Sequence, residues 1–187
     1  MNAALLGLDA PTLLSGCGAA LCLTIAPMFR SRQSILLAQL GAAVFFATHY
    51  MLLGITVASV ANMLNIVQIG TAFYAVRSAA MARLGYLLIV LMVLSGFWFW
   101  QGPISAFSVA AMTLIALARM QVSELGLRLL LIAGGGFWVV HDFIGEAWIA
   151  LAADIGAILT GTTALLALFI RVTIKWQPLP SARAAVT

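Results

Sequence analysis

Phe137-Trp138-Val139-Val140-His141-Asp142, with Asp154 further along, is half of a matched pair of stretches. The other half is Phe45-Phe46-Ala47-Thr48-His49-Tyr50, with Asn62 beyond it, and each matched position lies 92 residues earlier. The chain contains two histidines, and they occupy the same position in the two stretches. Because the chain has only two histidines, their match indicates an internal repeat, and the predicted fold is organised around it.

The composition is that of an integral membrane protein. Of 187 residues, 64% are hydrophobic and 7% are charged, whereas a soluble domain carries roughly a quarter charged residues. The net charge of +4 does not come from a basic cluster on one face, which excludes a nucleic-acid interface. The expected partner of most of the surface is the lipid bilayer.

Seven apolar segments are each close to the roughly 20 residues that a membrane-spanning helix needs. We therefore predict an all-α membrane protein of seven transmembrane helices in a single domain covering residues 1–187. The predicted segments are Pro11–Phe29, Ser34–Leu53, Thr56–Val76, Leu84–Trp100, Pro103–Met120, Leu127–Gly145 and Ala147–Ile170.

The basic residues predict the orientation of the chain. All nine fall in or beside alternate joints and the final tail, namely Arg30, Arg32, Arg77, Arg83, Arg119, Arg128, Arg171, Lys175 and Arg183. The opposite joints and the start hold Asp9 and Glu146 instead. Because basic flanks stay cytoplasmic, we expect the N-terminus outside and a cytoplasmic tail over residues 171–187.

The 92-residue offset divides the chain into two three-helix repeats, residues 11–76 and 103–170, joined by a linker helix over 84–100. Pro11 and Pro103 match at the start of each repeat. The odd linker helix gives both repeats the same orientation in the membrane. Parallel repeats of this kind are a transporter design in which the substrate site lies between the halves.

Each repeat is predicted to hold a polar pair inside the membrane. With a rise of about 1.5 Å per residue, His49 lies at the depth of Asn62, and His141 lies at the depth of Asp154. Ionisable groups in the membrane interior are costly and indicate a functional site. His141 and Asp154 can share a proton, which makes them the candidates for proton coupling. In the alternative interpretation, both pairs only fasten neighbouring helices together.

Further residues extend this candidate substrate site. Asn65 continues the polar stripe of Asn62, and Trp138 lies one helical turn before His141. Pro27 removes a helix hydrogen bond near the inner end of the first segment, so it is a candidate gating hinge or simply a helix end. Tyr50 and Asp142 are interpreted as boundary residues near the outer surface.

No pattern in the sequence indicates catalysis, a cofactor or a metal. Cys17 and Cys22 are five residues apart in one apolar segment, which is neither a metal motif nor a reason for a disulfide. Phosphate-binding loops and nucleophile–base pairs are also absent from the sequence. We therefore expect that the protein is not an enzyme.

Three motifs carry a resemblance to a known family. His49-Tyr-Met-Leu-Leu-Gly54, Asn62-x-x-Asn65 and Trp138-Val-Val-His141-Asp-Phe143 resemble the YgjV-type bacterial inner-membrane proteins. The resemblance covers most of the chain and implies a location in the bacterial inner membrane. It implies no particular chemistry.

The arrangement of three helices, a linker and three helices is also similar to the SWEET sugar transporters and the PnuC vitamin-precursor transporters. The chain lacks the proline–glutamine dipeptide of the related PQ-loop proteins, since Pro27 is followed by Met28. The resemblance is therefore one of architecture, and architecture does not fix function.

Two functions remain as hypotheses. The first is a small transporter or facilitator that binds a small polar molecule between His49/Asn62 and His141/Asp154, with the halves opening in turn. The second is a membrane receptor or interaction subunit in which the polar pairs are structural. A homo-oligomer is compatible with both.

Overall fold

The computed structural model of the protein describes residues 9–54, 56–100 and 102–175. Regular structure in these ranges is entirely helical, as expected. Seven α-helices and one 3-10 turn (η2) follow one another as α1 Ala10–Ile25, η2 Ala26–Met28, α2 Arg32–Leu52, α3 Thr56–Ala75, α4 Ala79–Trp98, α5 Ile104–Met120, α6 Glu124–Ile144 and α7 Trp148–Lys175. Helix α7 continues to Lys175, into the predicted tail; residues 176–187 of that tail lie outside the described ranges.

Five of these helices are long and apolar enough to cross a membrane: α1 together with η2, α2, α4, α6 and α7. Helix α5 is also apolar but has 17 residues. The outer surface of the bundle carries many exposed leucine, valine and aromatic side chains, which suits contact with lipid. Trp98 and Trp148, at the ends of α4 and α7, are 84% and 59% exposed, as is usual for side chains in the headgroup region.

Three helices begin earlier than their apolar segments. Helices α2, α4 and α6 were predicted from Ser34, Leu84 and Leu127, but they begin at Arg32, Ala79 and Glu124. The physical reason is capping: a serine before each helix accepts a hydrogen bond from the backbone N–H three residues on, which satisfies a donor that the helix leaves free. Hydropathy marks only the apolar part of such a helix.

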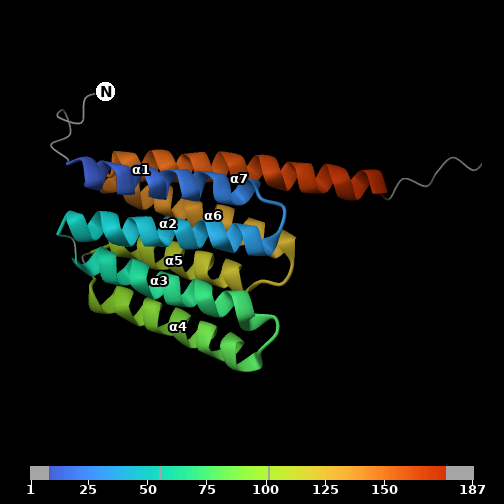
Figure 1. Ribbon diagram of the computed structural model, residues 1–187, viewed down its shortest axis with the longest axis horizontal. Helices are drawn as coiled ribbons and strands as arrows, with labels where there is room; N and C mark the ends of the chain where they lie inside the picture. Colours follow the sequence, from blue (N-terminus) through green and yellow to red (C-terminus); the bar gives the residue numbers. More distant parts are fainter. Residues whose placement is uncertain (1–8, 55, 101, 176–187) are drawn as a thin grey trace, which may run out of the picture.

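The helices pack side by side as a bundle (Figure 1). Neighbours in the chain pack on one another throughout, and two further contacts, α3 with α5 and α1 with α7, close six helices into a ring. Helix α4 packs on α3 and α5 at the edge of the bundle. Helix α7 runs past the other helices at the end where the loop between α1 and α2 lies.

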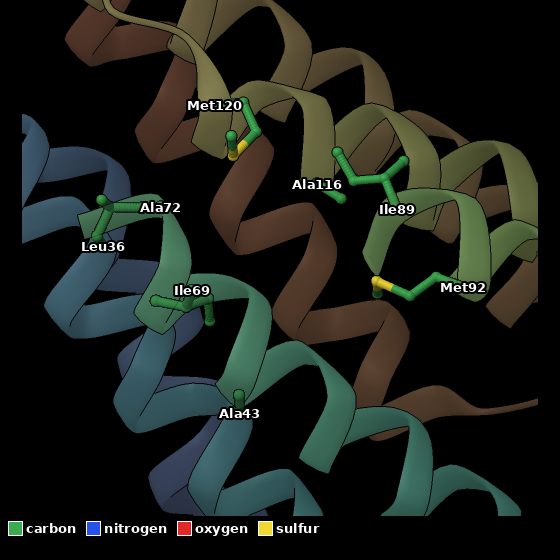
Figure 2. Packing of buried hydrophobic residues seen from close by; sticks show 8 residues of the cluster. All are labelled: Leu36, Ala43, Ile69, Ala72, Ile89, Met92, Ala116 and Met120. Atoms are coloured by element: carbon green, nitrogen blue, oxygen red, sulfur yellow. The ribbon is translucent and has the colours of Figure 1, made fainter. Parts of the chain in front are cut away.

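The main hydrophobic core lies between α2, α3, α4 and α5 (Figure 2). Leu36, Ile69, Ile89 and Met120 are among its members. Small residues bring these helices close together: a Cβ on Gly85 of α4 would lie 2.8 Å from the sulfur of Met120 on α5. Packing through small residues is how helices associate where the hydrophobic effect gives little drive. This core supports one side of the ring and leaves the centre for other residues.

The 92-residue offset recurs in the helix boundaries. Helices α2 and α6 both have 21 residues, and their first and last residues differ by 92; the starts of α3 and α7 also differ by 92. The turns that precede α3 and α7 contain Gly54 with φ of +72° and Glu146 with φ of +55°, again 92 residues apart. Glutamate rarely adopts a positive φ, so the shared geometry reflects a shared turn.

Candidate functional site: a central cavity with an acidic and a basic end

A cavity of about 360 Å³ lies inside the ring of helices. Its described lining comes from α1, η2, α2, α3, α5, α6, α7 and Ala147 in the turn before α7, and none of it comes from α4. Gln39 and Tyr50 of α2 both line it, and eleven residues of helix extend over roughly 16 Å. A cavity of this size is within the range of small-molecule sites.

Much of the lining consists of residue pairs at matched positions of the two halves. Phe46 of α2 matches Trp138 of α6, and Asn62 of α3 matches Asp154 of α7, each 92 residues apart. Further matched pairs in the lining are Leu23 with Ile115, Pro27 with Arg119, Gln39 with Leu131, Ala43 with Gly135, Tyr50 with Asp142, and Asn65 with Ala157. Positions 92 residues apart therefore line the same cavity but carry different chemistry.

One end of the cavity is acidic. Asp142 of α6 and Asp154 of α7 are 4% and 8% exposed, and their side chains are joined by a hydrogen bond. Asp142 also contacts the Nδ1 atom of His141 at 2.9 Å, and Tyr50 of α2 lies within electrostatic range of both carboxyl groups. Asp142 therefore links His141 to Asp154.

The other end of the cavity contains Arg119 of α5, whose side chain is 7% exposed. Its Nε donates to the side-chain oxygen of Gln39 at 2.8 Å. Its Nη1 donates to the side-chain oxygens of Asn65 at 3.0 Å and Gln68 at 3.1 Å. The guanidinium thus joins α2, α3 and α5 through three neutral amides.

Two more arginines fasten the halves to each other at this basic end. Arg32 of α2 donates from Nη2 to the backbone oxygen of Arg119 at 2.6 Å and from Nε to that of Gln121 at 2.9 Å. Arg128 of α6 donates to the backbone oxygens of Pro27 and Phe29, at 2.5 Å and 2.7 Å. The two pairs of acceptors are again 92 residues apart.

These contacts satisfy carbonyl groups that a helix end leaves without partners. Arg32 also donates to the backbone oxygen of Ala72 near the end of α3, at 2.9 Å. Arg128 forms an ion pair with Glu124 at 2.7 Å and is itself 3% exposed. Arg119 and Arg128 are therefore buried inside the bundle, whereas Arg32 is partly exposed at its end.

Most of the residues predicted for the site meet in this cavity. Asn62, Asn65, Trp138, His141 and Asp154 line it, and so does Pro27, the candidate hinge. Pro27 lies in the 3-10 turn η2 directly after α1, where its carbonyl oxygen accepts a hydrogen bond from Arg128.

His49 lies elsewhere, at the contact between α2 and α1. Its Nδ1 atom is 2.8 Å from the backbone oxygen of Thr12, and a Cβ on Gly16 would lie 3.0 Å from its ring. Each of the two matched stretches also has two adjacent aromatic residues before its histidine, and in each stretch one of the two lines the cavity and the other does not. Phe46 and Trp138 line the cavity, whereas Phe45 packs over Gly18 of α1 and Phe137 packs beside Phe107 of α5.

Sequence reasoning missed several polar residues of the cavity. Tyr50 and Asp142 were interpreted as boundary residues near the outer surface, but both line the cavity. For Asp142 the interpretation is wrong, because it is buried and joins His141 to Asp154. Arg119 was assigned only to the basic flanks, and Gln39 was not singled out. A signal existed for both, because an arginine and a glutamine inside apolar segments need buried partners; the sequence could not show that they are partners of each other.

In the described residues, no group of three or more potential metal ligands comes together. A family model described as Imp-YgjV, a bacterial inner membrane protein, matches residues 11–170. No curated protein and no solved structure was found to match the chain. Together with five apolar helices of spanning length, the family match identifies a multi-pass protein of the bacterial inner membrane.

Proposed function

The chain belongs to the Imp-YgjV family of bacterial inner membrane proteins, and we propose that it is a transporter or facilitator of a small polar molecule. The observation that carries this proposal is the central cavity, which is lined by positions 92 residues apart in two three-helix sets. Its described lining contains six ionisable side chains: Tyr50, Arg119, Arg128, His141, Asp142 and Asp154. Buried ionisable groups around a cavity inside a membrane bundle mark a substrate or ion pathway.

Two parallel repeats, α1 to α3 and α5 to α7, would give this cavity its symmetry. The equal lengths of α2 and α6, the matched turns at Gly54 and Glu146, and the matched lining residues support this interpretation. Helix α4 would be the linker, as in the SWEET-like layout. In such a protein the halves rock against each other around a fixed site.

All seven helices would span the membrane, with the basic end of the cavity toward the cytoplasm. Arg30, Arg32, Arg77 and Arg83 lie at the helix ends near Arg119 and Arg128, and basic residues favour the cytoplasmic side. The acidic end with Asp142 and Asp154 would then face outward.

The acidic end would couple transport to protons. A hydrogen bond between two carboxyl groups requires a proton on one of them, because an ionised carboxylate is only an acceptor. The groups facing this proton are Asp142 and His141 of α6, Asp154 of α7 and Tyr50 of α2. If this proton is released when a solute enters or leaves the cavity, the movement of protons is linked to the movement of the solute.

The first prediction tests this coupling with Asp154→Asn, which keeps the shape of the side chain but cannot release a proton. Proteoliposomes with an internal pH dye are exposed in turn to panels of carboxylates, amino acids, sugars and nucleosides. We expect saturable, solute-dependent proton flux with the wild-type protein and loss of at least about 90% of it in Asp154→Asn. Asp9→Asn removes the same charge at the exposed start of α1 and should leave the flux unchanged.

The proposal fails if none of the panels produces proton or solute flux with the wild-type protein. If the wild type and Asp154→Asn take up a solute at equal rates, the protein is a facilitator and the proposed proton coupling is rejected.

A membrane receptor or interaction subunit is the second candidate. The contact of His49 with the backbone of Thr12, away from the cavity, favours it, because this side chain fastens α2 to α1. This candidate requires that Asp154→Asn and Arg119→Gln change stability alone, with no solute that binds saturably to the wild-type protein.

A further inference from the structure

The basic end of the cavity has hydrogen-bond donors that the protein itself does not use. Arg119 donates through Nε and Nη1. Among the described residues, its Nη2 has no acceptor, and no buried polar side-chain atom in the described chain lacks a partner. Because Arg119 lines the cavity, its Nη2 group must reach the open volume.

The same guanidinium fixes the orientation of the amides around it. A guanidinium only donates hydrogen bonds, so the oxygen atoms of Gln39 and Asn65 must point toward it. Their NH₂ groups therefore point away from Arg119, and both residues line the cavity. The result is a set of three donors in one place: Nη2 of Arg119, Nε2 of Gln39 and Nδ2 of Asn65.

The charge at this end is also uncompensated. Among the described residues, the arginine that pairs with a carboxylate is Arg128, with Glu124, and all acceptors of Arg119 are neutral. A buried charge without a counter-ion is strongly destabilising. Arg128 differs from Arg119, because Glu124 and two backbone carbonyls occupy its donors.

We propose that Arg119, Gln39 and Asn65 bind the carboxylate of a small organic monoanion whose apolar body lies in the cavity. This inference rests on the proposed function and names the class of its substrate. A carboxylate complements the guanidinium in charge and geometry. Beyond the three donors, the body of the ligand meets Ala42, Phe46, Ile132 and Trp138, which favour a flat or apolar group over a sugar.

Binding to the purified full-length protein in detergent tests the proposal without any transport. The probes are benzoate and its neutral match benzamide, and the readout is saturable thermal stabilisation. We expect benzoate to stabilise the wild-type protein and benzamide to have no effect at the same concentrations. Arg119→Gln should weaken benzoate binding about tenfold to a hundredfold, because a charge-assisted hydrogen bond is lost. Arg83→Gln, at an exposed arginine of α4, is the matched control and should bind like the wild type.

Arg119→Gln removes contacts between helices. A second variant therefore tests the site independently, in case the Arg119→Gln protein does not fold. Asn65→Asp places a carboxylate of the same shape 3.0 Å from Nη1 of Arg119. It should fold, gain an internal ion pair and lose benzoate binding by at least about tenfold.

Equal stabilisation by benzoate and benzamide, no stabilisation by benzoate, or wild-type binding in Asn65→Asp would each overturn the carboxylate site. The outcomes for the proposed function are separate. Benzoate binding without flux in proteoliposomes would retain the site and reject transport, whereas flux of sugars or cations alone would retain transport and reject the site.

Discussion

At the residue scale, the bundle is held together by polar side chains that reach between helices. Arg119 reaches three amides on α2 and α3, and His49 reaches a backbone oxygen on α1. An unpaired polar group in an apolar interior costs several kcal/mol, so each such residue needs a partner wherever the fold supplies one. The identity of that partner depends on which helices become neighbours.

This dependence explains what the sequence could predict about the site. Asn62, Asn65, Trp138, His141 and Asp154 were found because the repeat and the rarity of polar residues in apolar segments mark them, and all five line the cavity. Gln39 lies 80 residues from Arg119, and no local pattern relates two such positions. The orientation of His49 toward Thr12 depends on the packing of α1 on α2 and could not be read from spacing.

The run Gly134-Gly135-Gly136 of α6 gives a residue-scale prediction about packing. A Cβ at Gly134 would lie 2.6 Å from a side-chain carbon of Ile115 and 3.1 Å from the backbone oxygen of Ala111, whereas a Cβ at Gly136 would meet nothing within 4 Å. We expect Gly134→Ala to lower the free energy of unfolding by about 1–3 kcal/mol, because α5 and α6 must separate.

Gly136→Ala is its matched control in the same helix. It should raise the free energy of unfolding by roughly 0.5–1 kcal/mol, because alanine loses less backbone entropy than glycine in a helix. Denaturant titrations in detergent give both values. Equal effects of the two substitutions would mean that α5 and α6 do not approach each other at Gly134 as closely as the structure indicates.

At the element scale, hydropathy located every helix but placed several starts too late. The apolar runs end where charged and polar residues begin, while a helix continues until its backbone groups are capped. Ser31, Ser78 and Ser123 provide such caps before α2, α4 and α6. Arg32 and Glu124 are therefore helical residues, and this places the side chain of Arg32 toward the end of α5.

The caps of the two matched helices should contribute similarly to stability. Ser31 accepts from the backbone N–H of Ser34 at 3.0 Å, and Ser123 accepts from that of Gly126 at 3.1 Å. Ser31→Ala and Ser123→Ala should each lower the free energy of unfolding by about 0.5–2 kcal/mol. Ser95→Ala, inside α4, where the hydroxyl only returns to the backbone oxygen of Met92, should change it by less than about 0.5 kcal/mol. A loss at Ser95 equal to that at the caps would contradict the assignment of these helix starts.

At the scale of the whole molecule, the two halves meet differently at the two ends of the cavity. At the basic end, Arg32 and Arg128 each cross to carbonyl groups of the opposite half. At the acidic end, the hydrogen bonds of Asp142 join α6 to α7 within one half. The arginine bonds that a rocking motion would have to break therefore lie at the basic end.

Removing one of these fasteners should open the cavity at the basic end. Arg32→Gln eliminates charge-assisted hydrogen bonds to the backbone oxygens of Ala72, Arg119 and Gln121. A cysteine in place of Ala157, which lines the cavity, reports its accessibility once Cys17 and Cys22 are replaced by serine. In inverted membrane vesicles, an impermeant maleimide should label this cysteine on the order of tenfold faster in Arg32→Gln than in the parent, because such bonds are worth about 1.5–3 kcal/mol.

Arg83→Gln is the control and should label at the parent rate, since its side chain lies on the outside of α4. If Arg32→Gln and Arg83→Gln label alike while both proteins remain folded, the arginine contacts do not hold the halves closed. If faster labelling appears only in right-side-out vesicles, the basic end faces outward, and the direction in which the cavity opens must be reversed.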